Sequence, residues 1–119
     1  MSLSESRQGE QLAAVSNAIV GIYSECYGRG PTKAKSYLFD HYLLTVLEDI
    51  LTPVEQTLVE RGRHDLVRTV RLTFQEAVAE RFRAAVSENT GRRVISYHSQ
   101  VVFDPDLGFE IFVLEPQSS

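Results

Sequence analysis

The feature that most constrains this fold is a change of pattern at the turn Gly28-Arg29-Gly30-Pro31. Before the turn, apolar residues recur at the three- and four-residue spacing of one helix face, whereas after it they alternate or run together as in strands. Glycine readily adopts the left-handed conformation that ends a helix, and proline prevents the helix from resuming. We therefore expect a helix over about residues 8–27 and a β hairpin directly after it.

The alternation of helix and hairpin continues along the chain. We expect strands over residues 33–39 and 41–48, a short helix from Pro53 to near Gly62, a long helix over about 65–89, and strands over 93–103 and 109–115. The second strand is apolar on both faces, which is typical of a strand inside a sheet. The order α-ββ-αα-ββ predicts an α+β fold with a four-stranded, mainly antiparallel sheet and helices on one face.

Helical spacing also predicts which side chains are buried. The predicted buried stripe of the long helix consists of Leu66, Val70, Phe74, Ala77, Val78, Phe82 and Ala85. Arg71 falls outside that stripe. Cys26 lies on the apolar stripe of the first helix, so we expect a buried structural thiol rather than a nucleophile. A single cysteine can form no intramolecular disulfide, which fits a reducing compartment.

Two further motifs are expected to be architectural. Thr52 can cap the short helix, Pro53 suits its first position, and Glu55 completes a capping box. Gly91 follows the long helix and can end it as Gly28 ends the first. We therefore interpret all four residues as structural rather than functional.

At 119 residues the chain is expected to form one domain. We predict a flexible N-terminal segment over residues 1–10, a domain over 11–116 and a flexible tail over 117–119. The pairs Gly28-Arg29 and Gly91-Arg92 each stand between a helix and a strand pair. That recurrence fits either an internal αββ duplication or chance similarity.

Several function classes are disfavoured by composition. The formal net charge of -4 argues against a nucleic-acid binder. No segment approaches the ~18 apolar residues of a spanning helix, and the polar N-terminus has no secretion-signal core, so we expect a cytoplasmic protein without direct membrane insertion. The three histidines His41, His64 and His98 lack metal-ligand spacing, and no nucleophile or paired-carboxylate motif is present. We therefore expect no enzymatic activity, no metal and no cofactor.

The first glycine turn is the candidate binding site. Gly28, Arg29 and Gly30 could form a nest of backbone amides beside a guanidinium, with Lys33 adding positive charge. This pattern predicts an anion-binding site. The competing interpretation is a plain helix cap and turn, because the dipole at a helix C-terminus repels anions.

Four motifs together resemble the MpsC-like family. They are Gly28-Arg29-Gly30-Pro31, Leu51-Thr52-Pro53-Val54-Glu55, Thr90-Gly91-Arg92 and Phe112-Val113-Leu114-Glu115. The resemblance covers residues 12–116, and it departs from the family at Asp40-His41, where relatives carry an acidic pair. The family is named for a Na⁺-translocating membrane-potential-generating system. The resemblance thus implies a link to cation and bicarbonate transport, and it carries no catalytic residue set.

The combined expectation is a non-catalytic, soluble accessory or regulatory protein. It would act by protein–protein contact with a membrane ion or bicarbonate transport system, and it could be peripheral to the membrane through that partner. The alternative is a small-anion or metabolite sensor that uses the Gly28-Arg29-Gly30 turn. Because the long helix exceeds what a sheet of short strands can cover, we also expect a homodimer that buries the excess apolar surface or a sheet edge.

Overall fold

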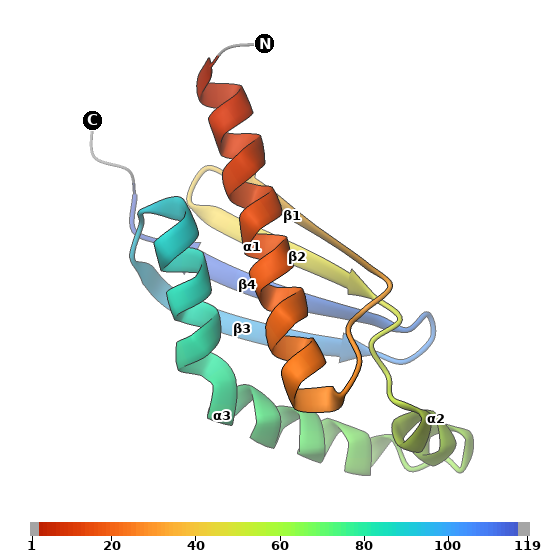
Figure 1. The fold of residues 1–119 in the computed structure, drawn as a ribbon. Coiled ribbons are helices and arrows are strands. Elements are labelled where there is room, and N and C mark those ends of the chain that lie inside the picture. Colours follow the sequence, from red (N-terminus) through yellow and green to blue (C-terminus); the bar gives the residue numbers. More distant parts are fainter. Residues whose placement is uncertain (1–2, 117–119) are drawn as a thin grey trace.

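The computed structural model describes residues 3–116, which form helices on one side of a single sheet (Figure 1). The elements are α1 Leu3–Tyr27, β1 Lys33–Phe39, β2 Tyr42–Glu48, α2 Pro53–Glu60, α3 His64–Thr90, β3 Val94–Val102 and β4 Leu107–Leu114. The predicted order and the α+β class are confirmed. Helix α1 begins at Leu3, earlier than expected, and the predicted flexible tail over 117–119 lies outside the described residues.

The sheet has the strand order β1-β2-β4-β3, and every neighbouring pair is antiparallel. The doubly apolar strand β2 is therefore interior, as its sequence predicts. The units α1-β1-β2 and α3-β3-β4 each place their first strand at an edge and their second strand in the centre. The two units therefore occupy equivalent places in the sheet.

Both architectural motifs form as predicted. The Thr52 hydroxyl accepts a hydrogen bond from the Glu55 backbone at 3.2 Å, and the Glu55 carboxylate accepts one from the Thr52 backbone at 2.9 Å. Pro53 is the first helical residue of α2. Gly91 has a φ of 71° and donates its N–H to the Ser87 carbonyl at 2.9 Å, which ends α3. These contacts satisfy backbone groups that a helix leaves unpaired at its ends.

One face of the sheet packs against α1 and α3 (Figure 1). Helix α1 crosses the strands and also contacts α3, so the core lies between these two helices and the sheet. Its buried apolar side chains include Val15, Ile19, Tyr23, Leu43, Leu47, Phe82, Val86, Phe112 and Leu114. The prediction of helices on one face is confirmed, and no helix of the described residues covers the other face.

The predicted buried stripe of α3 is wrong in its first half. Leu66 and Val70 are 38% and 54% exposed, whereas Val67 and Arg71 are buried. Figure 1 shows the reason: α3 bends, and its first half runs past the end of the sheet to pack on α2. In the second half the helix lies on the sheet and buries Val78, Phe82 and Ala85 as predicted. Ala77 is exposed, so its predicted burial is wrong.

The prediction of a buried Cys26 is also wrong, since this thiol is exposed. Its neighbours Tyr23 and Tyr27 turn inward instead, toward the ring of Phe74. Cys26 Sγ lies 3.8 Å from a guanidinium nitrogen of Arg81 on the outer side of the two helices. The last turn of α1 therefore presents its aromatic residues, and not its cysteine, to the core.

Candidate functional site

The first glycine turn has the predicted backbone geometry. Gly28 has a φ of 76° and donates its N–H to the Ser24 carbonyl at 3.0 Å. Gly30 lies against α1, and a Cβ atom there would come within 2.6 Å of the Ser24 hydroxyl oxygen. The positive φ of Gly28 is therefore required by the turn itself, whatever it binds, and a side chain at Gly30 would require Ser24 to shift.

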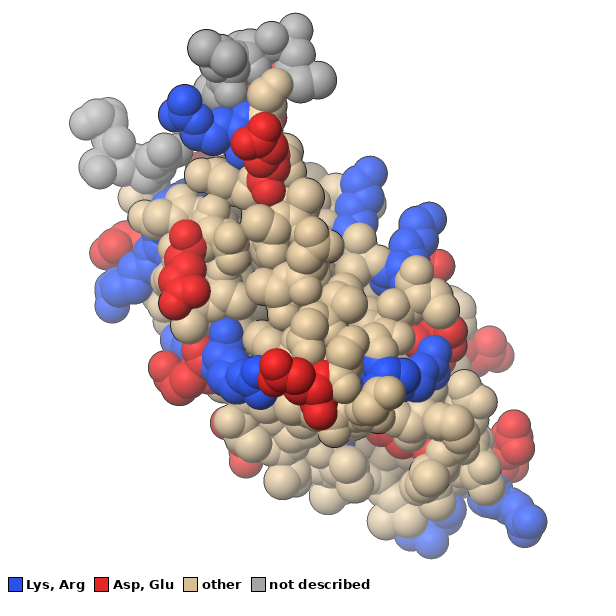
Figure 2. All heavy atoms as spheres, in the orientation of Figure 1, with Lys and Arg blue, Asp and Glu red and all other residues tan. Residues whose placement is uncertain are grey.

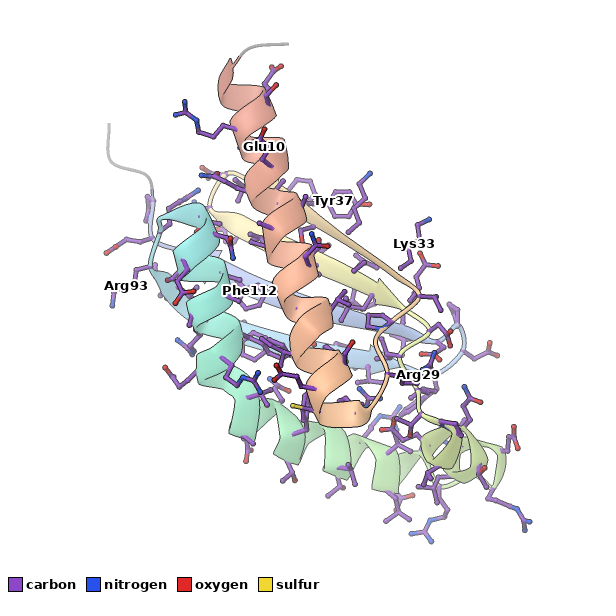
Figure 3. The ribbon with its side chains drawn as sticks, in the orientation of Figure 1. Glu10, Arg29, Lys33, Tyr37, Arg93 and Phe112 are labelled. Carbon is purple, nitrogen blue, oxygen red and sulfur yellow. The ribbon has the colours of Figure 1, made fainter. Side chains whose placement is uncertain are left out.

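The charged residues of the predicted anion site already have partners. Arg29 donates from one terminal nitrogen to the Leu51 carbonyl at 2.6 Å and from the other to the Asp49 carboxylate at 3.0 Å. Lys33 lies 3.8 Å from the Glu48 carboxylate (Figure 3 labels Arg29 and Lys33). Arg29 thus ties the turn to the segment between β2 and α2. An anion would compete with Asp49 for the same guanidinium, and binding at this turn stays a prediction.

The covered face of the sheet contains a buried polar row. Ser36, Thr45, Glu110 and Ser99 occupy neighbouring positions on the four strands. The Ser36 hydroxyl lies 2.7 Å from that of Thr45 and 2.8 Å from that of Ser16 on α1. Buried hydroxyls are normally paired in this way, because leaving them unpaired in an apolar core is costly. The polar row therefore links α1 to the two strands nearest it.

Glu110 is the charged member of this row, and it is 1% exposed. One of its carboxylate oxygens accepts a hydrogen bond from the Tyr23 hydroxyl at 2.7 Å, and the other accepts one from Tyr97 at 2.6 Å. Burial raises the pKa of Glu110, and the hydrogen bonds, which favour the carboxylate, lower it by less. The sequence analysis missed this residue, although an acid at an inward position of an apolar strand was a visible signal.

A second buried carboxylate, Glu55, is paired with a charge. Arg71 is 5% exposed and donates two hydrogen bonds to this carboxylate, at 2.7 and 2.5 Å, and one to the Ile50 carbonyl at 2.8 Å. Burial raises the pKa of Glu55, but its hydrogen bonds with Arg71 and Thr52 outweigh burial, so the pKa is lowered. The Arg71 guanidinium carbon also lies 4.1 Å from the centroid of the Tyr27 ring. Glu55 therefore joins a helix cap to an ion pair between α2 and α3.

A cavity of about 210 Å³ opens between the first half of α3, the end of α1 and strand β3. Polar groups from Arg68, Arg71, Gln75, Gln100 and Glu110 line it, and Phe82 and Val101 contribute apolar walls. None of the predicted anion-site residues lines this cavity. The sequence analysis missed it because the cavity depends on the bend of α3 and on contacts between distant segments.

The prediction of no metal site is based on the sequence spacing of the three histidines. In the structure each histidine lies in a different place. His41 lies 3.0 Å from Asp40 in the first hairpin turn, His64 packs on the ring of Phe103, and His98 is exposed on β3. No group of three histidine, cysteine or acidic side chains within residues 3–116 could hold a metal ion. The three histidines therefore have no common site.

The uncovered face of the sheet, called here the open sheet face, is mostly apolar. From one end to the other its cross-strand rows are Phe39-Tyr42-Val113-Ser96, Tyr37-Leu44-Ile111-His98, Lys35-Val46-Phe109-Gln100 and Lys33-Glu48-Leu107-Val102. Phe39 is 58% exposed and Tyr42 is 48% exposed. Figure 2 shows the opposite, helical side, where charged residues of both signs are scattered. The two sides of the molecule therefore differ in where their charged residues lie, which are scattered on the helical side and confined to the margins of the open sheet face.

These features define a small α+β protein with a helix-covered sheet face, an open apolar sheet face and a polar cavity beside the core. None of the helices in the described part of the chain combines the length and hydropathy that a membrane span requires. The family model described as Na⁺-translocating membrane potential-generating system (MpsC) matches residues 7–116, so the chain belongs to the MpsC family. No curated protein and no solved structure matches the chain.

Proposed function

We propose that this protein is a non-catalytic accessory or regulatory component of the membrane-potential-generating system for which its family is named. In this proposal it works from the cytoplasmic side of the membrane and acts by protein–protein contact. The family membership supports the association with that system. The open sheet face supports the self-association that this contact role is proposed to require.

An uncovered face of an antiparallel sheet is ordinarily polar because it meets water. Here both central strands present apolar side chains outward, with Leu44 and Val46 on β2 and Phe109 and Ile111 on β4. The four strands lie about 4.8 Å apart, and seven residues along a strand rise about 3.3 Å each, so the face measures roughly 19 by 23 Å. That area, about 440 Å² before side-chain relief is counted, includes the polar positions of the face. Its apolar part is of the order of the few hundred Å² of patches that often mark interaction sites.

The occupant proposed for this face is a second copy of the chain. The polar positions lie at its margins, with Lys33 and Lys35 on one edge strand, Glu48 at one end, and His98 and Gln100 on the other edge strand. An apolar centre inside a polar rim is the usual anatomy of a protein interface. Two apolar sheet faces can pack about 10 Å apart as a β-sandwich.

The size of the face also suits a dimer. Two flat faces total roughly 900 Å² before side-chain relief, which enlarges this area toward the roughly 1,200–2,000 Å² of a stable interface. A two-fold arrangement places the same surface on both copies, as in most homodimers. The helical layers then lie on the two outer sides of the dimer, where a membrane protein of the transport system can contact them.

The proposal is tested in cells that lack the gene. Deletion should lower the Na⁺-dependent membrane potential reported by a voltage-sensitive dye, and the wild-type chain should restore it. Ile111→Lys, at the centre of the open sheet face, should not restore it. Val54→Lys is the matched control, because Val54 is 71% exposed on α2 and lies off the sheet. Full restoration by Ile111→Lys, or a deletion without effect on the potential, would contradict the proposal.

A further inference from the structure

The cavity beside α3 is built around an arginine that has hydrogen-bonding capacity left over. Arg71 uses Nε and Nη2 for Glu55 and for the Ile50 carbonyl. Its Nη1 is buried and has no hydrogen-bond partner within residues 3–116. Buried donors are rarely left unpaired, so an acceptor is expected at this nitrogen. Arg71 lines the cavity, and a bound molecule can supply that acceptor.

A second arginine lines the same cavity. Arg68 is exposed, and its guanidinium carbon lies 4.7 Å from the centroid of the Phe103 ring, which orients the side chain. Arg68 forms no ion pair with an acidic residue in the described part of the chain. Two guanidinium groups one helical turn apart on α3 form a typical receptor for a carboxylate. The side-chain amides of Gln75 and Gln100 add neutral hydrogen-bonding groups.

Part of the wall is apolar. Phe74, Phe82 and Val101 line the cavity, and Phe82 is fully buried. A cavity of about 210 Å³ corresponds to the liquid volume of about seven water molecules at roughly 30 Å³ each. The space therefore suits a small molecule with one polar group and a short apolar part.

We propose that this cavity binds a small carboxylic acid with an apolar tail. The carboxylate accepts hydrogen bonds from Arg71 Nη1 and from Arg68, and the tail packs on Phe82 and Val101. Glu110 is the one acidic group on the wall, and both of its oxygens already accept tyrosine hydroxyls.

The proposal is tested by calorimetric titration of the full chain with hexanoate, benzoate, hexylamine and hexanol. The two acids should bind, hexanol should bind about tenfold more weakly, and hexylamine should not bind. Equal binding of hexanol or hexylamine would overturn the carboxylate assignment. No binding of either acid at millimolar concentration would overturn the proposal altogether.

Variants locate the binding. Arg71→Lys can fail to fold because Arg71 also holds Glu55, so the decisive variants lie elsewhere. Arg68→Ala should weaken both acids about tenfold and leave hexanol unchanged, and Val101→Phe, which fills the cavity, should abolish binding. Arg83→Ala, an arginine on α3 that does not line this cavity, is the matched control and should bind like the wild type. Unchanged acid binding in both Arg68→Ala and Val101→Phe would contradict the proposed site.

Discussion

Each face of the sheet departs in one respect from the usual distribution of polarity. The covered face carries the polar row that includes Ser36, Thr45 and Glu110, although helices remove it from water. The open sheet face carries apolar residues such as Phe109 and Ile111, although no helix of the described chain covers them. A single copy therefore pairs the polar groups of this row by hydrogen bonds but leaves the apolar side chains of the open sheet face uncovered.

The two faces contribute differently to the specificity and the stability of the fold. Hydrogen bonds from the polar row to α1, through Ser16 and Tyr23, favour one register of helix on sheet. Such bonds add specificity more than net stability, because the same groups bond to water when unfolded. The open sheet face offers no directional groups at its centre. Burial of its apolar side chains is favourable, and this free energy is gained only when another apolar surface covers the face.

The largest expected effect separates the two faces directly. Phe112 is fully buried and packs on Tyr97, with ring centroids 5.0 Å apart, so Phe112→Ala should lower the free energy of unfolding by about 3–5 kcal/mol. The loss should not depend on protein concentration. Phe109→Ala, on the same strand but the other face, removes a half-buried side chain and should cost about 1 kcal/mol in dilute solution and more where the dimer forms.

Denaturant titrations at two protein concentrations measure both variants. A concentration-independent loss of similar size at Phe112 and Phe109 would mean that the two faces are equally part of a single-chain core.

The buried acid of the polar row gives a second effect, which depends on pH. Because burial raises the folded pKa of Glu110 above its unfolded value, its contribution to stability is fully present below the unfolded pKa and is lost as pH rises through the folded pKa. Glu110→Gln should therefore raise the thermal midpoint relative to wild type at pH 8. The advantage should shrink as pH falls toward 4.

Glu55→Gln is the matched control for that experiment. The folded pKa of Glu55 is lowered, so its contribution is present above the unfolded pKa and is lost as pH falls. This variant should be less stable than wild type at pH 8, and the difference should shrink on acidification. The same direction of change in both variants would show that the two carboxylates do not differ as their surroundings imply.

The smallest expected effect lies away from both faces. Thr52→Ala removes the side-chain half of the capping box and should lower the free energy of unfolding by about 1 kcal/mol. The loss should be independent of protein concentration, and the oligomeric state should not change. A variant of wild-type stability with altered assembly would indicate that this motif is functional rather than architectural.

Much of the fold is predictable from local signals. The helix caps at Gly28, Thr52 and Gly91 depend on neighbouring residues, and all three form as expected. The interior position of β2 follows from its apolar character on both faces. Such features are encoded within a few residues of where they appear, so periodicity and turn chemistry reveal them.

The candidate sites are less predictable because they depend on distant contacts. The burial of Arg71 requires Glu55, sixteen residues away, and the bend that carries α3 past the sheet. Periodicity assigns an arginine to the surface and Val70 to the core, and both assignments fail here. The open sheet face is hard to predict for a related reason. Alternation in β1 separates two sets of side chains but does not show which set the helices cover.

The oligomeric state of the chain tests the central claim most directly. Light scattering at tens of micromolar should give the wild type a mass about twice the 13.4 kDa of one chain. Ile111→Lys should give the mass of one chain with unchanged helical content, because Ile111 points away from the core, and Val54→Lys should remain dimeric. A monomeric wild type, or a dimeric Ile111→Lys variant, would contradict the assignment of the open sheet face as the surface that joins two copies.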